Sequence, residues 1–210
     1  MNPIFDFFLA PYQSYSGLDI FLEGAAVSTG LLSVWLAKQN KLGVYPSGMV
    51  STAIYVYLLL QAGLLGDFLI NAYYFAMSVY GWIFWTRQKE GKSLNPIDKM
   101  NGTEKQWSFY LFVLSLLFVG GVYAVFGKWS SWTALIDTFT TAVFFVGMWL
   151  MARRKIAHWI FWIVGDLISI PLYLYKGLAL TSFQYLIFTL IAIFGYSQWK
   201  RIYNNSLQTV

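Results

Sequence analysis

A stripe of aromatic and polar side chains runs along one apolar segment near the C-terminal end of the chain. Trp159, Trp162, Asp166, Ser169 and Tyr173 follow one another at helical i, i+3, i+4 and i+7 spacing. Indole faces stack on flat rings and attract cations, and a carboxylate balances a positive charge or accepts hydrogen bonds. The stripe predicts a wall for a flat, aromatic, polar-substituted ligand. Two alternatives stay open, namely Trp159 as an interfacial anchor and Asp166 as a structural hydrogen-bond partner.

Further polar side chains lie on other apolar segments. Asn71 and Tyr74 share a face of residues 65–86, and Gln184 lies near the start of residues 180–199. Amides offer paired donors and acceptors that suit a carboxamide or sugar hydroxyls, although they also join helices to each other in membranes. The predicted binding set is therefore Asn71, Tyr74, Trp159, Trp162, Asp166, Tyr173 and Gln184.

Two more acids, Glu23 and Asp137, lie about one and a half turns inside the ends of their apolar segments. Charged side chains at such depth normally face the protein interior or a water-filled space. We interpret them either as lining an outer vestibule or as structural hydrogen-bonding groups.

Several kinds of chemistry are excluded by what the sequence lacks. It has no Cys and one His, His158, so we expect no disulfide, no thiolate site and no multi-histidine metal centre. It has no GxxxxGK[ST], HExxH or GxSxG motif. We therefore expect no catalytic residues, no bound metal or cofactor, and no ATP-driven step.

The amino-acid composition indicates the environment of these residues. Of 210 residues, 58% are hydrophobic, 20% are aromatic and 11% are charged, whereas a soluble domain has about 25% charged residues. Mean hydropathy is +0.56. The composition predicts an all-α polytopic membrane protein, which excludes a soluble enzyme, a disordered regulator and a secreted disulfide scaffold.

Seven stretches are long and apolar enough to cross a bilayer. A membrane-spanning helix needs about 20 apolar residues. We expect spans at residues 18–37, 43–61, 65–86, 107–126, 132–152, 157–175 and 180–199. Residues 1–17 are too short to span and predict an interfacial segment, residues 87–106 form a polar linker, and residues 202–210 form a tail.

The basic residues predict the orientation of these spans. Twelve of the fourteen Lys and Arg lie on the side of residues 87–106 and the C-terminus, and only Lys128 and Lys176 lie on the other side. By the positive-inside rule, we expect the N-terminus outside and the C-terminus in the cytoplasm. The net charge of +5 thus reflects topology and contact with the lipid bilayer, and we expect no nucleic-acid partner.

The chain also repeats itself. At a constant offset of 114, residues 18–87 and 132–201 share 12 identities in 70 positions, including the pairs Trp35 with Trp149 and Trp85 with Trp199. We interpret residues 18–86 and 132–201 as two three-helix repeats, joined by residues 87–131, which hold the linker and a fourth helix. Because the fourth helix returns the chain to its starting side, the repeats are parallel. The resulting 3+1+3 arrangement is that of SWEET-type transporters, with a central site between the halves.

Three segments resemble the PnuC family of bacterial vitamin transporters. They are NAYYFAMSVYGWIFWTR (71–87), HWIFWIVGDLISIPLYLYKGLALTSFQYL (158–186) and IAIFGYSQWKR (191–201). The likeness covers nearly the whole seven-helix core, and its most specific part is the helix with Trp159, Trp162 and Asp166.

The resemblance implies a homotrimer in the bacterial cytoplasmic membrane that takes up nicotinamide riboside by facilitated diffusion, with trapping by a separate kinase. It implies that Trp159, Trp162 and Tyr74 hold the pyridinium ring and that Asp166 balances its charge or binds ribose. Asn71 and Gln184 would then bond the carboxamide or ribose. Similar relatives carry thiamine, riboflavin or deoxynucleosides, so these substrates remain alternatives. A membrane enzyme or assembly factor is an alternative of another class, but an enzyme would need more acids and His on adjacent helices.

Overall fold

The computed structural model describes residues 16–61, 65–89, 92–127, 129, 132–176 and 179–208. Within these residues the fold is all-helical apart from one two-stranded hairpin, which confirms the predicted class. The helices are α2 (Gly17–Lys38), α3 (Val44–Gln61), α4 (Leu65–Thr86), α5 (Gly102–Val125), α6 (Trp132–Ala152), α7 (His158–Tyr175) and α8 (Ala179–Gln208). The strands are β1 (Gln88–Lys89) and β2 (Lys92–Ser93), which pair antiparallel. The predicted interfacial segment 1–17 lies almost wholly outside the described residues.

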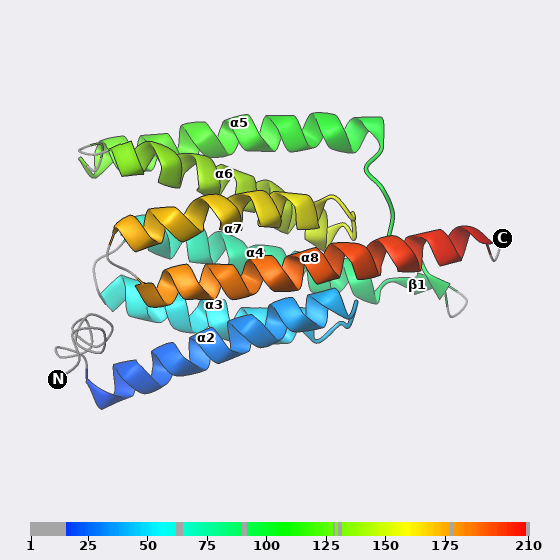
Figure 1. Ribbon diagram of the computed structural model, residues 1–210, viewed down its shortest axis with the longest axis horizontal. Coiled ribbons are helices and arrows are strands. Elements are labelled where there is room, and N and C mark those ends of the chain that lie inside the picture. The colour runs from blue at the N-terminus through cyan, green and yellow to red at the C-terminus, as the bar shows by residue number, and fades with distance from the viewer. Residues whose placement is uncertain are drawn as a thin grey trace.

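The seven helices lie side by side, with their connections at the two ends of one bundle (Figure 1). Each has at least 18 residues, or about 27 Å of helix. Four of them, namely α2, α5, α6 and α7, meet the length and apolarity expected of a membrane span. We call one end of the bundle the basic end, because Lys38, Lys41, Arg153, Arg154 and Lys155 lie there. This end carries the α2–α3 and α6–α7 connections, the two strands and the C-terminal end of α8.

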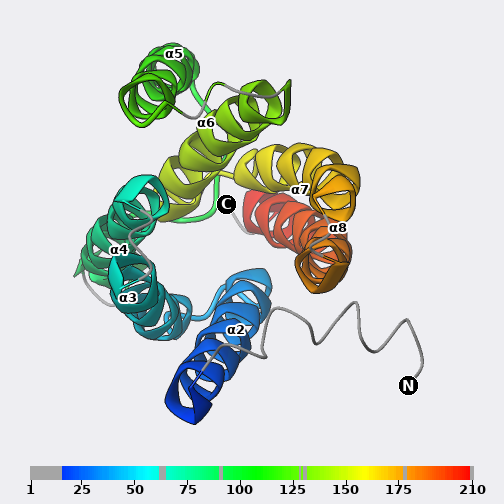
Figure 2. The same ribbon diagram turned by 90° about the vertical axis from the view of Figure 1, so that its left-hand side faces the viewer.

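Helix α5 stands outside a closed ring that is formed by α2, α3, α4, α6, α7 and α8 (Figure 2). Each ring helix contacts the next one in the order α2, α3, α4, α6, α7, α8, and α8 in turn contacts α2. Helix α5 packs chiefly against α6. The ring thus has two halves, α2–α4 and α6–α8, which meet at an α4–α6 seam and an α8–α2 seam. These contacts are compatible with the predicted 3+1+3 arrangement.

Two helix boundaries differ by more than one residue from the sequence prediction. Helix α5 begins at Gly102 rather than near residue 107, because Asn101 and Glu104 form a capping box that satisfies its first backbone amides. Helix α8 continues through the predicted tail to Gln208. Ile202 and Tyr203 pack against the core, so this polar extension has an apolar face to bury.

Contacts at the two seams recur at the offset of 114 found in the sequence. The Trp85 indole Nε1 donates to the Met151 carbonyl at 3.3 Å and to the Ala152 carbonyl at 3.1 Å. Its repeat partner Trp199 donates to the Ala37 carbonyl at 2.9 Å. Ala37 and Met151 are themselves 114 residues apart, so the two bonds are equivalent and each crosses one seam. Together they tie the halves to each other at the basic end.

The packing around these indoles repeats in the same way. The Tyr45 ring meets Trp85 edge-on at 5.1 Å, and its repeat partner Trp159 meets Trp199 edge-on at 5.8 Å. A Cβ at Gly81 would lie 2.3 Å from the Tyr45 ring, and one at Gly195 would lie 2.6 Å from Trp159. Both glycines therefore admit a large ring against the helix backbone. We call Tyr45, Trp85, His158, Trp159 and Trp199 the indole cluster; all five side chains are buried.

The polar linker is fastened to the α6–α7 turn beside this cluster. The Glu104 carboxylate, 4% exposed, pairs with Arg153 at 3.2 Å and with Lys155 at 3.1 Å. The Arg154 guanidinium donates to the Asn95 carbonyl at 3.0 Å and lies 4.3 Å from the centre of the Trp85 ring. Burial lowers the pKa of this guanidinium from its usual value. These contacts hold the linker against the second half of the ring at the basic end.

We predict that Trp199→Phe lowers the free energy of unfolding by about 1 kcal/mol, because it removes a buried hydrogen bond across a seam. Trp85→Phe should have a similar effect, and each change should lower the melting temperature in detergent by about 2–4 °C. Trp107→Phe is the control, since that indole is 59% exposed. An equal decrease in the Trp107 variant would contradict a special role for the seam bonds.

Candidate functional site

A cavity of about 230 Å³ lies between the two halves of the ring. All six ring helices contribute to its wall, so it lies where the repeat predicts a central site. The lining residues are Gly30, Ser33, Val34, Val44, Gly48, Ser51, Thr52, Tyr74, Ser78, Phe144, Met148, Met151, Trp162, Asp166, Tyr185 and Phe188. Three predicted site residues, Tyr74, Trp162 and Asp166, are among them.

Repeat-equivalent positions line the cavity with different chemistry. Gly48 corresponds to Trp162 and Thr52 corresponds to Asp166, and all four residues line the cavity. The same holds for Gly30 and its partner Phe144. The first half thus presents glycines and small hydroxyls where the second presents rings and an acid. This asymmetry provides both an aromatic wall and the space beside it.

Trp162 is held between the cavity and the indole cluster. Its ring lies 5.5 Å from Trp159 and 5.2 Å from His158, edge-on to both. On the α6 side it packs against Gly147, where an added Cβ would lie 2.5 Å from indole Cδ1 and 2.6 Å from Nε1. The indole orientation is therefore fixed by a glycine on the neighbouring helix.

We predict that Gly147→Ala disturbs the site although Gly147 itself does not line the cavity. The added methyl group would overlap the indole, so Trp162 must tilt into the cavity or α6 must move away from α7. Ligand affinity should fall about tenfold, as measured by calorimetry, with a moderate loss of melting temperature. Gly121→Ala is the matched control, since a Cβ there meets nothing within 4 Å. Unchanged affinity in the Gly147 variant would show that the Trp162 orientation does not matter.

Asp166 lies near the middle of α7, two turns or about 12 Å along the helix from His158. Its side chain is 4% exposed and lines the cavity. Among the described residues, no hydrogen bond or ion pair reaches its carboxylate. A carboxylate at this depth is costly without a partner, which points to a group supplied by the cavity contents.

Three cavity hydroxyls of the first half already donate hydrogen bonds to backbone carbonyls. Ser33 Oγ donates to the Val44 carbonyl, Ser51 Oγ to the Ala26 carbonyl, and Thr52 Oγ1 to the Gly48 carbonyl, all at 2.7–2.8 Å. A hydroxyl that donates in this way still has oxygen lone pairs to accept with. This side of the cavity therefore suits a ligand that brings hydroxyl or amide donors.

The other predicted binding residues lie outside the cavity lining. Trp159 is fully buried in the indole cluster and contacts Trp162. Tyr173 stacks on Tyr185 with ring centres 5.1 Å apart, so it supports a lining residue. Asn71 and Gln184 are half-buried on α4 and α8. Sequence reasoning missed Tyr185, whose repeat partner is Asn71, and the signal that locates it is this equivalence.

The two predicted vestibule acids lie at the end of the bundle opposite the basic end. Asp137 forms an ion pair with Lys176 and accepts a hydrogen bond from the Tyr123 hydroxyl at 3.4 Å. These contacts join α6, α5 and the residue that follows α7. Glu23 lies on α2, and neither acid lines the cavity. No group of His, Cys, Asp and Glu side chains suited to a metal ion occurs among the described residues.

Several known proteins are similar to this chain over most of its length. The chain is 23% identical over 214 residues to the nicotinamide riboside transporter PnuC of Escherichia coli, with 87% of each chain covered. It is 25% identical to the protein of the same name from Neisseria mucosa, covering 88% of this chain and 73% of that one. It is also 27% identical to the riboflavin/roseoflavin transporter RibM of Streptomyces davaonensis, covering 81% and 80%.

The fold is shared with a solved structure. The crystal structure of the vitamin B3 transporter PnuC matches with a TM-score of 0.66 at 21% identity, covering 90% of this chain and 84% of that one. In addition, the family model described as "Nicotinamide mononucleotide transporter" matches residues 20–201, which include all the cavity residues. The resemblance to PnuC proteins seen in the sequence is thus confirmed, and the chain belongs to the nicotinamide mononucleotide transporter family of membrane proteins.

Proposed function

We propose that this protein carries nicotinamide riboside across the membrane by facilitated diffusion. The observation that supports the proposal most strongly is the cavity, in which the buried Asp166 lies among aromatic side chains and has no hydrogen-bond or ion-pair partner in the described part of the chain. Relatives that bear the name nicotinamide riboside transporter support the substrate. Membership of a transporter family also argues against an enzymatic role.

The chemistry of the riboside matches the two sides of the cavity. Its pyridinium ring is flat and cationic, so it suits the faces of Trp162 and Tyr74, and its charge suits Asp166. Its ribose hydroxyls are donors, which suits the hydroxyl oxygens of Ser51 and Thr52. In this account Tyr173 and Trp159 support the rings, and Glu23 and Asp137 serve the outer entrance. Asn71 and Gln184 lie outside the cavity lining, so no contact with the riboside is assigned to them in this conformation.

Transport would follow from the two-part construction of the ring. The halves contact each other chiefly along the α4–α6 and α8–α2 seams, so rocking one half against the other would change access to the cavity. The Trp85 and Trp199 bonds join the two halves at the basic end in the conformation described here. Because no ATP-binding motif is present, net uptake would depend on trapping of the riboside by a separate cytoplasmic kinase.

We place the protein in the bacterial cytoplasmic membrane as a homotrimer, with the N-terminus outside and the basic end in the cytoplasm. The orientation follows from the uneven distribution of Lys and Arg. Reporters fused at the C-terminus test it, since a reporter that is active only in the cytoplasm should be active. A C-terminus that is accessible from outside would overturn the orientation.

Riboflavin is the second candidate substrate, because one relative is a riboflavin/roseoflavin transporter. Riboflavin has a neutral, three-ring isoalloxazine system, which offers no partner charge to Asp166 and needs more space than a pyridinium ring. The cavity of about 230 Å³ would have to widen to admit it. Thiamine and deoxynucleosides are further family alternatives.

Uptake into proteoliposomes tests the transport proposal. Vesicles that contain the purified protein should equilibrate labelled nicotinamide riboside without any ion gradient, and unlabelled riboside should compete. When a riboside kinase and ATP are enclosed, the label should accumulate above the external concentration. A requirement for a sodium or proton gradient would overturn facilitated diffusion, and no protein-dependent uptake would overturn the substrate.

A further inference from the structure

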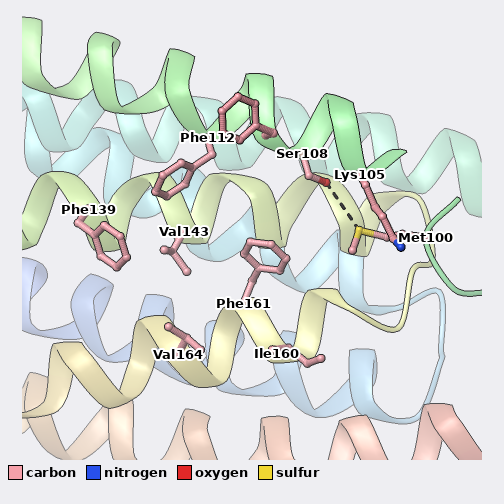
Figure 3. A pocket seen from close by; sticks show the side chains of 10 residues that line it. Met100, Lys105, Ser108, Phe112, Phe139, Val143, Ile160, Phe161 and Val164 are labelled. Atoms are coloured by element: carbon pink, nitrogen blue, oxygen red, sulfur yellow. Dashed lines mark hydrogen bonds between the residues drawn. The ribbon is translucent and has the colours of Figure 1, made fainter. Parts of the chain in front are cut away.

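A second hollow lies on the outside of the ring, between α5 and the second half (Figure 3). It has a volume of about 460 Å³ and is lined from α5, α6 and α7. Its walls are almost wholly apolar, with Phe109, Phe112, Phe139, Phe161 and Val164 among them. We call this hollow the α5 groove.

The groove exists because α5 stands outside the ring. Helix α5 packs on α6 but makes little contact with α4, so α6 forms the floor and α5 and α7 form the sides. Several wall residues face outward, since Phe109 is 63% exposed, Ile160 48% and Val164 41%. In a membrane protein, such a surface lies where acyl chains reach it.

One end of the groove is polar and basic. Figure 3 shows Met100, Lys105 and Ser108 gathered at this end, and Phe112, Phe139 and Val164 toward the other. Ser108 Oγ donates to Met100 Sδ at 3.7 Å. Lys105 is exposed, and no hydrogen bond or ion pair to its ammonium group occurs among the described residues. It lies in the first turn of α5, which is the depth of lipid headgroups for a helix that spans the bilayer.

We propose that the α5 groove is a binding site for an anionic phospholipid. One acyl chain lies along the phenylalanine-lined wall, and the headgroup phosphate pairs with Lys105. Charge complementarity favours this occupant, because the apolar groove ends at Lys105, a cation with no ion-pair partner among the residues that the structure describes, at the basic end where anionic headgroups concentrate. The site is distinct from the central cavity, with which it shares no lining residue.

Native mass spectrometry of the purified protein tests the site with two probes, phosphatidylglycerol and phosphatidylcholine of identical acyl chains. The wild type should retain phosphatidylglycerol about fivefold more than phosphatidylcholine, the preference expected of one Lys at headgroup depth. Lys105→Gln should abolish this preference. Lys200→Gln is the matched control, since this exposed lysine on α8 is remote from the groove, and it should keep the preference.

A groove-filling variant tests the apolar part separately. Val164→Trp should reduce retention of both lipids. Leu190→Trp is the control and should not reduce it, because Leu190 is a 51% exposed residue of α8 that does not line the groove. Equal retention of the two lipids by the wild type, or equal behaviour of the Lys105 and Lys200 variants, would overturn the proposal. A change of oligomeric state in Val164→Trp without lipid loss would show that a second copy covers the groove instead. None of these outcomes depends on the transported substrate.

Discussion

Replacing Asp166 by Asn should raise the dissociation constant for nicotinamide riboside about thirtyfold or more. The carboxylate is buried, lines the cavity and has no partner among the described residues, so the bound cation would be its counter-charge. Removing one member of a buried charge pair costs about 2–5 kcal/mol, and thirtyfold is the lower end of that range. Asn keeps the shape of the side chain, so the melting temperature should not fall. Calorimetry measures the constant.

Two controls separate charge balance from a general change of shape. The reduced riboside has a neutral ring and should bind the wild type and the Asn variant with similar affinity. Asp98→Asn, at a half-exposed acid beside the α6–α7 turn, should leave riboside binding unchanged. If Asp166→Asn binds the oxidised riboside as tightly as the wild type does, Asp166 has a structural role.

Trp162→Ala should weaken riboside binding by a similar factor, about thirtyfold. A cation over an indole in a desolvated site is worth about 2 kcal/mol or more, and Ala removes the ring face entirely. Trp162 also packs on Trp159 and Gly147, so this variant should lose stability as well. Calorimetry at a temperature well below its melting transition measures the affinity of the folded variant.

A series at position 162 keeps this prediction distinct from unfolding. Trp162→Phe retains a ring and should bind with intermediate affinity while it melts near the wild-type temperature. Trp82→Ala removes a 40% exposed indole that does not line the cavity, and it should bind normally. Equal affinities across the position 162 series would place the ligand away from this ring.

Composition and hydropathy were sufficient to predict the helices, because a bilayer forces nearly every spanning segment to be apolar and helical. The start of α5 was missed because its first turn is polar. The Asn101–Glu104 capping box, rather than hydrophobicity, stabilises this turn. The repeat was visible because paired residues such as Trp85 and Trp199 make equivalent bonds.

The predicted residues overlap with the cavity lining only in part, and the reason is geometric. Helix α7 contacts both α6 and α8, so one stripe of side chains serves two environments. Trp162 and Asp166 face the cavity, whereas Trp159 enters the indole cluster and Tyr173 stacks on Tyr185. Helical periodicity places these side chains on a common face of α7, but it does not show which neighbouring helix each of them packs against.

Apart from Tyr74, the first half of the cavity carried no visible sequence signal. Small residues such as Gly48, Ser51 and Thr52 in a membrane helix are ordinary helix-packing residues, so their type does not distinguish a binding wall. Their significance comes from the offset of 114, which places Gly48 and Thr52 at the positions of Trp162 and Asp166. Internal symmetry thus locates the small side of the site once the aromatic side is known.

Calorimetric titration of the purified wild-type protein tests the central claim most directly. Nicotinamide riboside, thiamine and riboflavin are titrated under the same conditions. We predict saturable binding of the riboside, with weaker or no binding of the other two, because only the riboside combines a single cationic ring with ribose hydroxyls. Tight binding of riboflavin or thiamine without riboside binding would contradict the account.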